Sequence, residues 1–352
     1  MKHVLPILCV LLSAVMTLSA ADDVQSATEG KGAQILRKNP DADLNGDGIL
    51  TREEFREYKD RPDGSASQVE KPRGEPRIKI TPTLANIPYL PHVANVIDFY
   101  KAESDEPTPL VLYIHGGAFR GGSKNGISQG ALKPLLDAGV SVAAIEYRLI
   151  GVAPLPAAHR DCARALQFIR SKATDWNLDK RRIGAFGGSA GAQICMWLAF
   201  HDDMAKSKSE DPIERESTRL SCVATKGSQT TMDLQWWIEN IPGYETPHRD
   251  PEESYRTTDR EEIAKIVKEI SVINHLTKDD PPLFMTYFQN PEDPVPSDPK
   301  KASNWSAHHV QFGLALKAKA DALGLETDLQ HPRSNSKYDS QTAFFMEHIW
   351  KQ

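Results

Sequence analysis

A serine flanked by glycines is the first feature of this sequence that could do chemistry. Gly187-Gly188-Ser189-Ala190-Gly191 follows a short apolar segment and precedes an apolar stretch with helical character. A serine at such a strand-to-helix turn is held in a strained backbone with its hydroxyl exposed, and flanking glycines let neighbouring backbone approach. The start of the helix adds a positive field near a developing oxyanion. The pattern predicts that Ser189 is a nucleophile and that Gly187 and Gly191 support its turn.

A second glycine cluster lies upstream, directly after another apolar segment. It reads His115-Gly116-Gly117-Ala118. Backbone N–H groups in such a loop can stabilise the negative oxygen of an acyl-transfer intermediate. The predicted donors are Gly117 and Ala118, together with Ala190 after the nucleophile. Gly116 is expected to permit the turn, and His115 to brace the loop.

The pattern of apolar residues after about residue 76 predicts the strands and helices that would position these residues. Short apolar runs, typical of strands buried on both faces, alternate with helical stretches. This alternation indicates a mostly parallel sheet covered by helices. Residues 234–280 interrupt the series and are expected to form an insertion that caps the substrate cleft. The expected strands are residues 110–114, 140–147, 182–186, 220–225 and 283–288, and the expected helices are residues 160–171, 190–200 and 312–323.

Both glycine motifs, each after a strand and in this order, resemble the carboxylesterase group of the α/β-hydrolase superfamily. The likeness is to its acetyl-esterase, feruloyl-esterase-like and hormone-sensitive-lipase-like branches, over roughly residues 76–352. The resemblance implies an α/β-hydrolase fold and two-step acyl transfer through a Ser-Asp-His triad. In this fold the triad members follow the chain order nucleophile, acid, histidine.

The acid is expected just past the strand at residues 283–288. Asp293, in the Glu292-Asp293-Pro294-Val295 turn, resembles the acid of the family, with Glu292 in reserve. An acidic surface turn without catalytic function is the alternative.

The base is harder to assign from the sequence. We expect the last strand at residues 325–330. In the family the base lies in the loop after that strand, usually in a Gly-His-Gly or Gly-His-Ala context. No Gly-His pair occurs there, and His331 is the one histidine of that window. We therefore predict His331 as the base. His308 and His309 are alternatives because they precede a predicted helix, and absence of a working base is the third reading. His348 is expected to be structural.

An acidic loop near the N-terminus matches the EF-hand calcium loop. Oxygen-bearing side chains stand at the first, third and fifth loop positions, and a glycine stands at the sixth. The predicted ligands are Asp43, Asn45, Asp47, the backbone carbonyl of Ile49, and Glu54. We predict a non-catalytic Ca²⁺ site here; an acidic turn that binds nothing is the alternative.

The chain start and the overall charge bear on location and partners. Residues 1–21 have the basic start, apolar run and small residues of a signal peptide, which predicts a secreted or periplasmic protein. Residues 22–60 then form the EF-hand-like segment, residues 61–75 a linker, and residues 76–352 the hydrolase. A net charge of −6 argues against nucleic acid as main partner, and no interior apolar run has the length of a membrane span.

These observations together predict an exported serine hydrolase that cleaves carboxylic esters, with acylated polysaccharides as a candidate substrate class. A catalytically silent α/β-hydrolase-fold binding protein is the first alternative. An exopeptidase-type serine hydrolase is the second.

Overall fold

The computed structural model describes residue 42, residue 54, residue 58, residues 80–247 and residues 250–350. Residue contacts divide the chain into two units, Met1–Ile78 and Lys79–Gln352. The predicted signal peptide, the linker and every predicted calcium ligand except Glu54 lie outside the described residues. Glu54 itself is helical and buried.

An eight-stranded sheet forms the centre of the second unit, in the order β1-β2-β4-β3-β5-β6-β7-β8. All neighbours from β4 to β8 pair in parallel, whereas β1–β2 and β2–β4 pair antiparallel. The five expected strands and the last strand expected near residues 325–330 are present. Strands β1 and β2 were not predicted; β1 is largely exposed and lacks an apolar pattern. The strands are β1 (Leu84–Pro88), β2 (Val96–Tyr100), β3 (Thr108–Ile114), β4 (Ser141–Ile145), β5 (Leu178–Gly188), β6 (Cys222–Lys226), β7 (Leu283–Thr286) and β8 (Thr327–Gln330).

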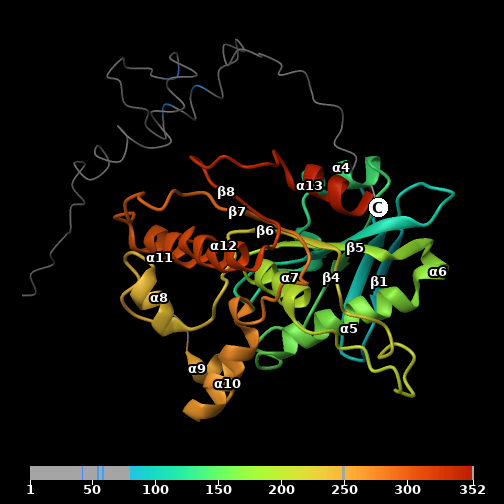
Figure 1. Ribbon diagram of the computed structural model, residues 1–352, viewed down its shortest axis with the longest axis horizontal. Helices are drawn as coiled ribbons and strands as arrows, with labels where there is room; N and C mark the ends of the chain where they lie inside the picture. Colours follow the sequence, from blue (N-terminus) through green and yellow to red (C-terminus); the bar gives the residue numbers. More distant parts are fainter. Residues whose placement is uncertain (1–41, 43–53, 55–57, 59–79, 248–249, 351–352) are drawn as a thin grey trace, which may run out of the picture. The chain divides into compact units, whose positions relative to one another are not determined.

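Helices cover both faces of this sheet. In Figure 1, α4 and α13 lie on one side of it, and α5, α7 and α12 lie on the other. This layered, mostly parallel arrangement is the α/β-hydrolase fold expected from the sequence. The helical elements are η2 (Lys124–Gly126), α4 (Gln129–Asp137), α5 (Ala157–Ser171), α6 (Ala173–Trp176), α7 (Ala190–Phe200), α8 (Leu234–Asn240), α9 (Pro251–Tyr255), α10 (Arg260–Ile270), η3 (Val272–Asn274), α11 (Pro299–Ala307), α12 (Gln311–Leu323), α13 (Gln341–Phe345) and the π-helical η4 (Met346–Trp350).

The core divides into two clusters because side chains alternate across the strands. Along β3, Val111 faces the α4 and α13 side, whereas Leu110 and Leu112 face the α5 and α7 side. Helix α7 has no polar face, and all of its residues are buried between the sheet and α5. A helix that is apolar all round must be buried in this way, and its first residue follows Ser189. The nucleophile therefore stands on the most deeply packed helix of the sheet.

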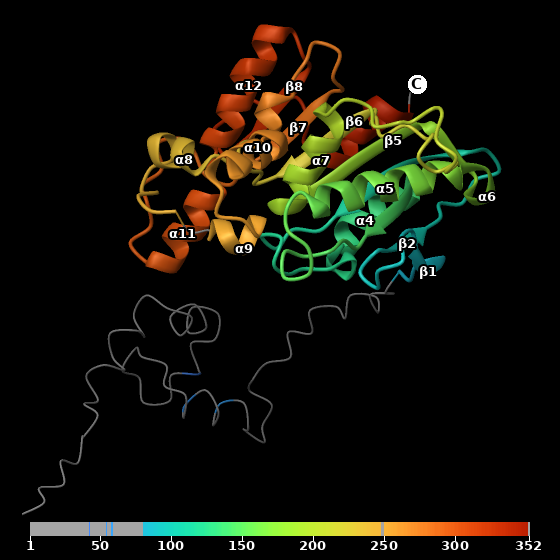
Figure 2. The ribbon, with the colours of Figure 1, turned by 90° about the horizontal axis from the view of Figure 1, so that it is seen from below.

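The insertion and the segment after it lie at one end of the sheet. In Figures 1 and 2, α8, α9, α10 and α11 gather at the end opposite β1. Arg120, in the loop after β3, forms a bidentate ion pair with Glu253 of α9, with N–O distances of 2.9 and 2.6 Å. The insertion therefore packs beside the predicted oxyanion loop.

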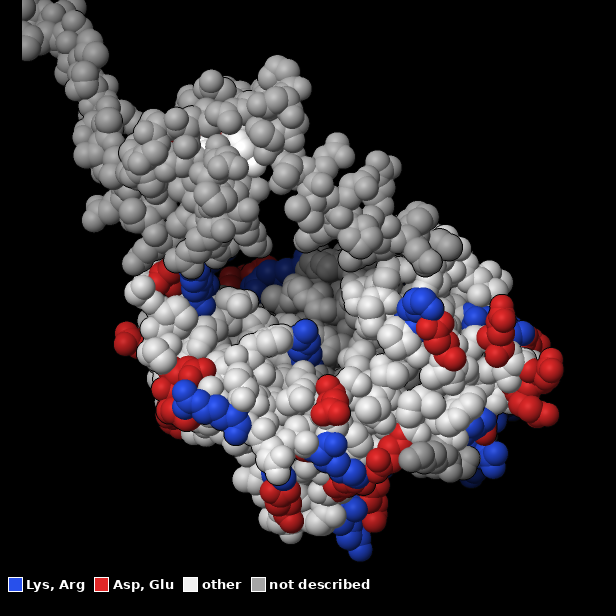
Figure 3. All heavy atoms as spheres, turned by 90° about the horizontal axis from the view of Figure 1, so that it is seen from above, with Lys and Arg blue, Asp and Glu red and all other residues white. Residues whose placement is uncertain are grey.

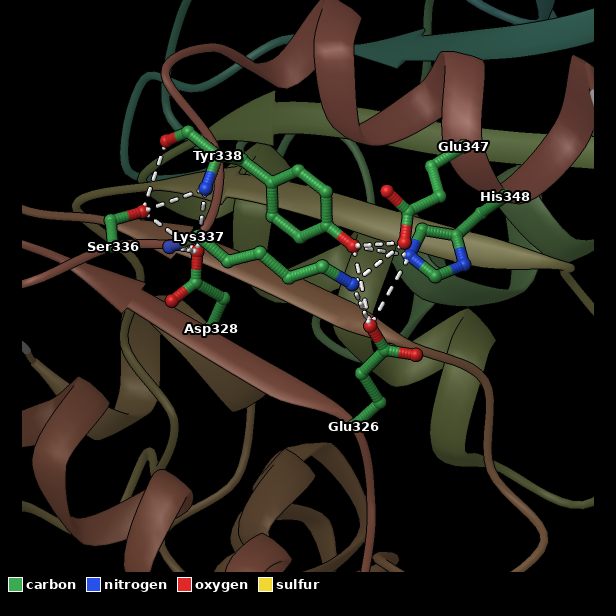
Figure 4. A network of polar contacts seen from close by, with 7 residues as sticks. All are labelled: Glu326, Asp328, Ser336, Lys337, Tyr338, Glu347 and His348. Atoms are coloured by element: carbon green, nitrogen blue, oxygen red, sulfur yellow. Dashed lines mark hydrogen bonds and ion pairs between the residues drawn. The ribbon is translucent and has the colours of Figure 1, made fainter.

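A polar network ties the segment after β8 to the C-terminal helix (Figure 4). The Lys337 ammonium lies 2.9 Å from Glu326 and 2.6 Å from Glu347. The Tyr338 hydroxyl lies 2.9 Å from Nε2 of His348, and burial raises the pKa of that tyrosine to about 12. His348 thus has the structural position expected of it, and the chain leaving β8 is anchored to the C-terminal helix.

Charged side chains of both signs are mixed on one face of the molecule. On the face drawn in Figure 3, basic and acidic residues lie beside one another across the described part of the chain. Within that part, no helix combines the length and apolarity needed to cross a bilayer.

Candidate active site

The turn that carries Ser189 has the strained geometry expected of a nucleophile turn. Ser189 has φ 52° and ψ −123°, a backbone conformation that non-glycine residues seldom adopt. Its N–H donates to the carbonyl of Lys226 at 2.9 Å, and its own carbonyl accepts from the N–H of Gln193 at 3.0 Å. Hydrogen bonds to β6 and to α7 therefore hold Ser189 in this strained conformation.

Backbone packs directly on backbone around this turn. A Cβ at Gly187 would lie 2.5 Å from the carbonyl oxygen of Ile114, and a Cβ at Gly116 would lie 2.5 Å from that of Gly188. A Cβ at Gly191 would overlap the Ile114 carbonyl oxygen. Only glycine fits at these three positions, so the turn and the loop after β3 can approach each other closely.

The loop after β3 is turned tightly beside the serine. Gly117, Ala118 and Phe119 have φ values of 120°, 54° and 61°. The Gly117 carbonyl accepts from two N–H groups further along the loop, at 2.9 and 3.0 Å. Ala190 is the first residue of α7, where an N–H has no acceptor within the helix. The three predicted oxyanion donors therefore belong to the two segments that meet at Ser189.

His115 packs at the start of this loop. Its ring stacks on Tyr147 with centroids 4.2 Å apart, and its Nε2 lies 3.2 Å from Glu146 Oε1. The Tyr147 hydroxyl donates to the His115 carbonyl at 2.8 Å. These contacts fix the start of the loop without bringing the His115 ring to the serine.

The imidazole that reaches Ser189 is His308. Its Nε2 lies 2.9 Å from Ser189 Oγ, and its Nδ1 lies 2.7 Å from the Asn304 carbonyl oxygen. Because a carbonyl oxygen only accepts, Nδ1 must carry the proton of this tautomer. Nε2 is then free to accept the serine hydroxyl proton, as a general base must.

Two contacts from the end of β6 hold His308 in place. The side-chain amide of Gln229 donates to the carbonyl of Ala307, the last residue of α11, and to that of Gly227 at 3.4 Å. Gly227 has φ 55°, and a Cβ there would lie 3.3 Å from Cδ2 of His308. The base is thus carried by the end of α11 and positioned against the strand next to the nucleophile.

His331, predicted as the base, is not brought to Ser189. Its Nδ1 lies 3.0 Å from Asn290 Oδ1, and its N–H donates to Ser334 Oγ at 2.7 Å. The physical reason lies in how the chain after β8 is held: Asp328, within β8, accepts from Ser336 Oγ at 2.7 Å and from the Lys337 N–H at 2.9 Å (Figure 4). The segment after His331 is thus bound to β8 and to the C-terminal helix, and the His331 ring bonds to Asn290 and not to the serine.

Asp293, predicted as the acid, closes its own turn. Its carboxylate accepts from the Asn290 N–H at 2.7 Å, and this bond keeps its pKa below the ordinary value. No histidine is its hydrogen-bond partner among the described residues. The reserve acid Glu292 pairs with Arg333 at 2.8 Å, and both side chains are exposed.

His309, the neighbour of the base, is enclosed instead of facing the serine. It is 1% exposed, and burial lowers its pKa to about 4. Its Nδ1 accepts from the N–H of Gln311 at 3.1 Å. The signal in the sequence for His308 was its place before a helix that starts at the active-site edge of the sheet.

A cleft of about 830 Å³ opens at Ser189 and His308. The insertion at residues 234–280 supplies none of its lining residues in the described structure; the segment from Phe288 to His308 forms much of its wall. The lining residues are Tyr113, Gly116, Gly188, Ser189, Lys226, Gly227, Phe288, Gln289, Pro296, Lys300, Lys301, Asn304, Trp305 and His308. A serine and an imidazole that can accept its proton stand in this cleft, next to the segments that carry the predicted oxyanion donors, and such an arrangement can carry out acyl transfer.

Similar solved structures agree with this fold. A truncated carbohydrate esterase from gut microbiota matches with a TM-score of 0.59 at 20% identity, over 76% of this chain and 96% of that one. An acetyl ester-xyloside bifunctional hydrolase from Caldicellulosiruptor lactoaceticus matches with a TM-score of 0.55 at 20% identity, over 73% and 89%. At these identities the likeness concerns the fold.

Sequence comparison finds a similar ester hydrolase and a matching family model. The ethyl acetate hydrolase of Pseudomonas putida is 25% identical over 168 residues, which are 44% of this chain and 53% of that protein. This chain therefore spans about half the length of that relative. The family model described as BD-FAE matches residues 97–299, a range that contains both glycine motifs and Asp293. Since this range is more than half of the 352 residues, the chain belongs to the BD-FAE family of α/β-hydrolases.

Proposed function

We propose that the protein hydrolyses carboxylic esters, with Ser189 as nucleophile and His308 as general base. The observation that carries the proposal is the 2.9 Å contact between Ser189 Oγ and His308 Nε2 at a strained turn. The name of the Pseudomonas putida relative, an ethyl acetate hydrolase, supports the same reaction class.

The reaction divides into two acyl transfers. His308 Nε2 takes the proton of Ser189 while Oγ bonds to the ester carbonyl carbon, and the backbone N–H groups of the oxyanion loop stabilise the negative oxygen. The bond to the alcohol then breaks, and the alcohol leaves with the proton from Nε2. Water next attacks the acyl-enzyme and gives its proton to Nε2. The carboxylic acid departs, and the proton returns to Ser189.

A backbone carbonyl takes the orienting role that the sequence assigned to Asp293. The Asn304 carbonyl fixes the tautomer and direction of His308 through a 2.7 Å bond. A carbonyl dipole stabilises the imidazolium of the transition state less than a full negative charge does. We therefore propose a Ser-His pair oriented by the main chain, with Asp293 shaping the turn at residues 290–293.

Hydrolysis of p-nitrophenyl acetate by the purified full chain tests the proposal. Ser189→Ala should lower kcat by about ten-thousand-fold or more, since loss of a nucleophile leaves only binding and oxyanion stabilisation. Ser171→Ala, on the exposed end of α5, is the matched control and should keep the parent rate. Equal rates for Ser189→Ala and the parent protein would overturn the assignment. A folded chain that cleaves no ester would instead favour the silent binding protein.

Acylated polysaccharides are the substrate class we propose. The support is the cleft wall, where Tyr113, Phe288 and Trp305 present aromatic surface beside the serine, and the 67% exposed Phe288 can stack on a sugar ring. Release of acetate from acetylated xylan, compared with p-nitrophenyl acetate, measures this preference. Phe288→Ala should raise KM for the polymer more than for the small ester; an equal change in both would contradict the proposal.

Export and calcium binding are further proposals from the sequence. A secreted or periplasmic protein cleaved after Ala21 would begin at Asp22, which N-terminal sequencing of the exported fraction can read. Calorimetric titration of the full chain with Ca²⁺ should give one site, and Asp43→Ala should abolish it. Asp105→Ala, an exposed residue of the hydrolase unit, is the control.

A further inference from the structure

Three lysines stand in the wall of the cleft that contains Ser189. They are Lys226, Lys300 and Lys301, and all three are exposed. The lining residues include no aspartate or glutamate. The cleft wall therefore carries three formal positive charges, although the whole chain has a net charge of −6.

These lysines lack the ion pairs that several other lysines of the described structure form. Seven others form ion pairs within the described residues, namely Lys124, Lys133, Lys172, Lys180, Lys206, Lys317 and Lys337. None of the three cleft lysines has a carboxylate within ion-pair distance in that part of the chain. Their charges are therefore available to a ligand.

Neighbouring carboxylates have other partners. Asp298 accepts from the Lys301 N–H at 2.8 Å as the cap of α11, while Asp293 accepts from Asn290 and Glu292 pairs with Arg333. None of these contacts neutralises a cleft ammonium group. The cleft ammonium groups therefore form no direct ion pair with the carboxylates of the segment that builds much of the wall.

The two lysines of α11 do not stabilise that helix. Lys300 and Lys301 lie in its first turn, where the helix dipole disfavours positive charge. Lys226 extends from the end of β6, and its ammonium lies 4.6 Å from the centre of the Phe288 ring at the cleft wall. An anion in the cleft would interact favourably with all three groups.

We propose that the preferred ester carries an anionic group, a carboxylate or a sulfate, close to the scissile bond. This inference rests on the proposed ester hydrolysis and names its substrate class. The lysines would raise the capture of such esters through attraction across the cleft, an effect that salt screens because the groups are exposed. Lysine is a compact point charge without a fixed fork of donors, so it suits either anion.

Three aryl acetates test the inference with the full chain. One is 4-(carboxymethyl)phenyl acetate, the second is its neutral methyl ester, and the third is 4-(2-sulfooxyethyl)phenyl acetate. At low ionic strength we expect kcat/KM for an anionic ester to exceed that for the neutral one roughly tenfold. A preference for the carboxylate alone, or for the sulfate alone, identifies the source of the anion. The preference should shrink in 0.5 M salt.

Charge variants separate the cleft from the rest of the surface. Lys300→Gln/Lys301→Gln should lose most of the preference for the anionic ester. Lys208→Gln/Lys278→Gln changes the net charge equally at exposed positions outside the cleft and should keep it. Equal kcat/KM for anionic and neutral esters would overturn the inference, as would a preference that survives the Lys300/Lys301 change.

Binding to Ser189→Ala distinguishes failure of this inference from failure of the proposed function. If the parent chain cleaves none of the three esters, the proposed function fails. Calorimetry with the Ser189→Ala protein still tests whether the cleft binds anions. If it does, the carboxylate ester should bind several-fold more tightly than its methyl ester. Equal binding of these two esters would contradict the proposed anion site, whatever the outcome for catalysis.

Discussion

The nucleophile turn and the segment that carries the base are held in place by different means. Around Ser189, main chain packs on main chain, and a Cβ at Gly191 or Gly116 would collide with backbone. Around His308, buried glutamine side chains hold the end of α11: Gln229, in the loop after β6, donates to the Ala307 carbonyl, and Gln289 donates to the Trp305 carbonyl at 3.1 Å. The first arrangement is possible only with glycine, so it leaves a sequence motif. The second depends on side-chain amides that bind main-chain carbonyls, and such contacts leave no sequence motif.

The largest effect should come from removing the base. His308→Ala should lower kcat for p-nitrophenyl acetate by about ten-thousand-fold or more, because no other imidazole lies within reach of Ser189 Oγ in the described structure. His331→Ala should stay within about threefold of the parent rate, since its ring bonds to Asn290. Steady-state rates of the two variants decide between the histidines. The reverse ranking would return the role to His331.

Breaking the nucleophile turn should cost stability as well as activity. Gly191→Ala places a methyl group against the Ile114 carbonyl and the His115 backbone, so we expect a loss of about 3 kcal/mol or more in the free energy of unfolding. Gly130→Ala, inside α4 with open space around its Cβ, is the matched control and should be neutral or stabilising by up to about 1 kcal/mol. Urea unfolding measures both. A neutral Gly191→Ala would mean that the turn tolerates displacement.

Each region also contains a buried neutral histidine, which makes the protein sensitive to acid. His159 lies under the nucleophile helix, 2.6 Å from Gln193, and burial lowers its pKa to about 4, as it does for His309 beside the base. Both histidines bind protons in the unfolded chain below their ordinary pKa of about 6.5, but in the folded protein only near 4. Their contribution is present above about pH 6.5 and is lost as the pH falls to 4.

For His159 this amounts to about 2–3 kcal/mol between pH 7 and pH 4.5. Urea unfolding at the two pH values measures the difference in the free energy of unfolding. His159→Gln should reduce that difference, whereas His92→Gln, at an exposed position, should leave it unchanged. A pH-independent free energy of unfolding would contradict the burial of both rings.

Much of the fold, but less of the site, could be predicted from the sequence. The buried parallel strands and α7 have continuous apolar runs, and the turn at Ser189 has obligatory glycines, so local patterns sufficed. Strand β1 could not be predicted because its residues are exposed and its pairing partner defines it. The contact of His308 with Ser189 joins residues 119 positions apart, and the carbonyl that orients it has no side-chain signature. His331 matched the position expected of the family, after the last strand, but its ring bonds to Asn290 and its segment is held by the contacts of Asp328 and Ser336.

The smallest effect, and the sharpest test of how the base is held, concerns Gln229. Gln229→Ala removes the amide that donates to the Ala307 carbonyl, so the end of α11 and the His308 ring should become less well placed. Misplacement of a catalytic group slows the chemical step more than binding, so we expect kcat to fall by about tenfold while KM changes little. Gln235→Ala, whose amide bonds to exposed Glu239 at 2.8 Å, is the control. If Gln229→Ala lowered the unfolding free energy but kept kcat, Gln229 would be a packing residue only. The base would then be held by other contacts, among them the Asn304 carbonyl and the bond from Gln289 to the Trp305 carbonyl.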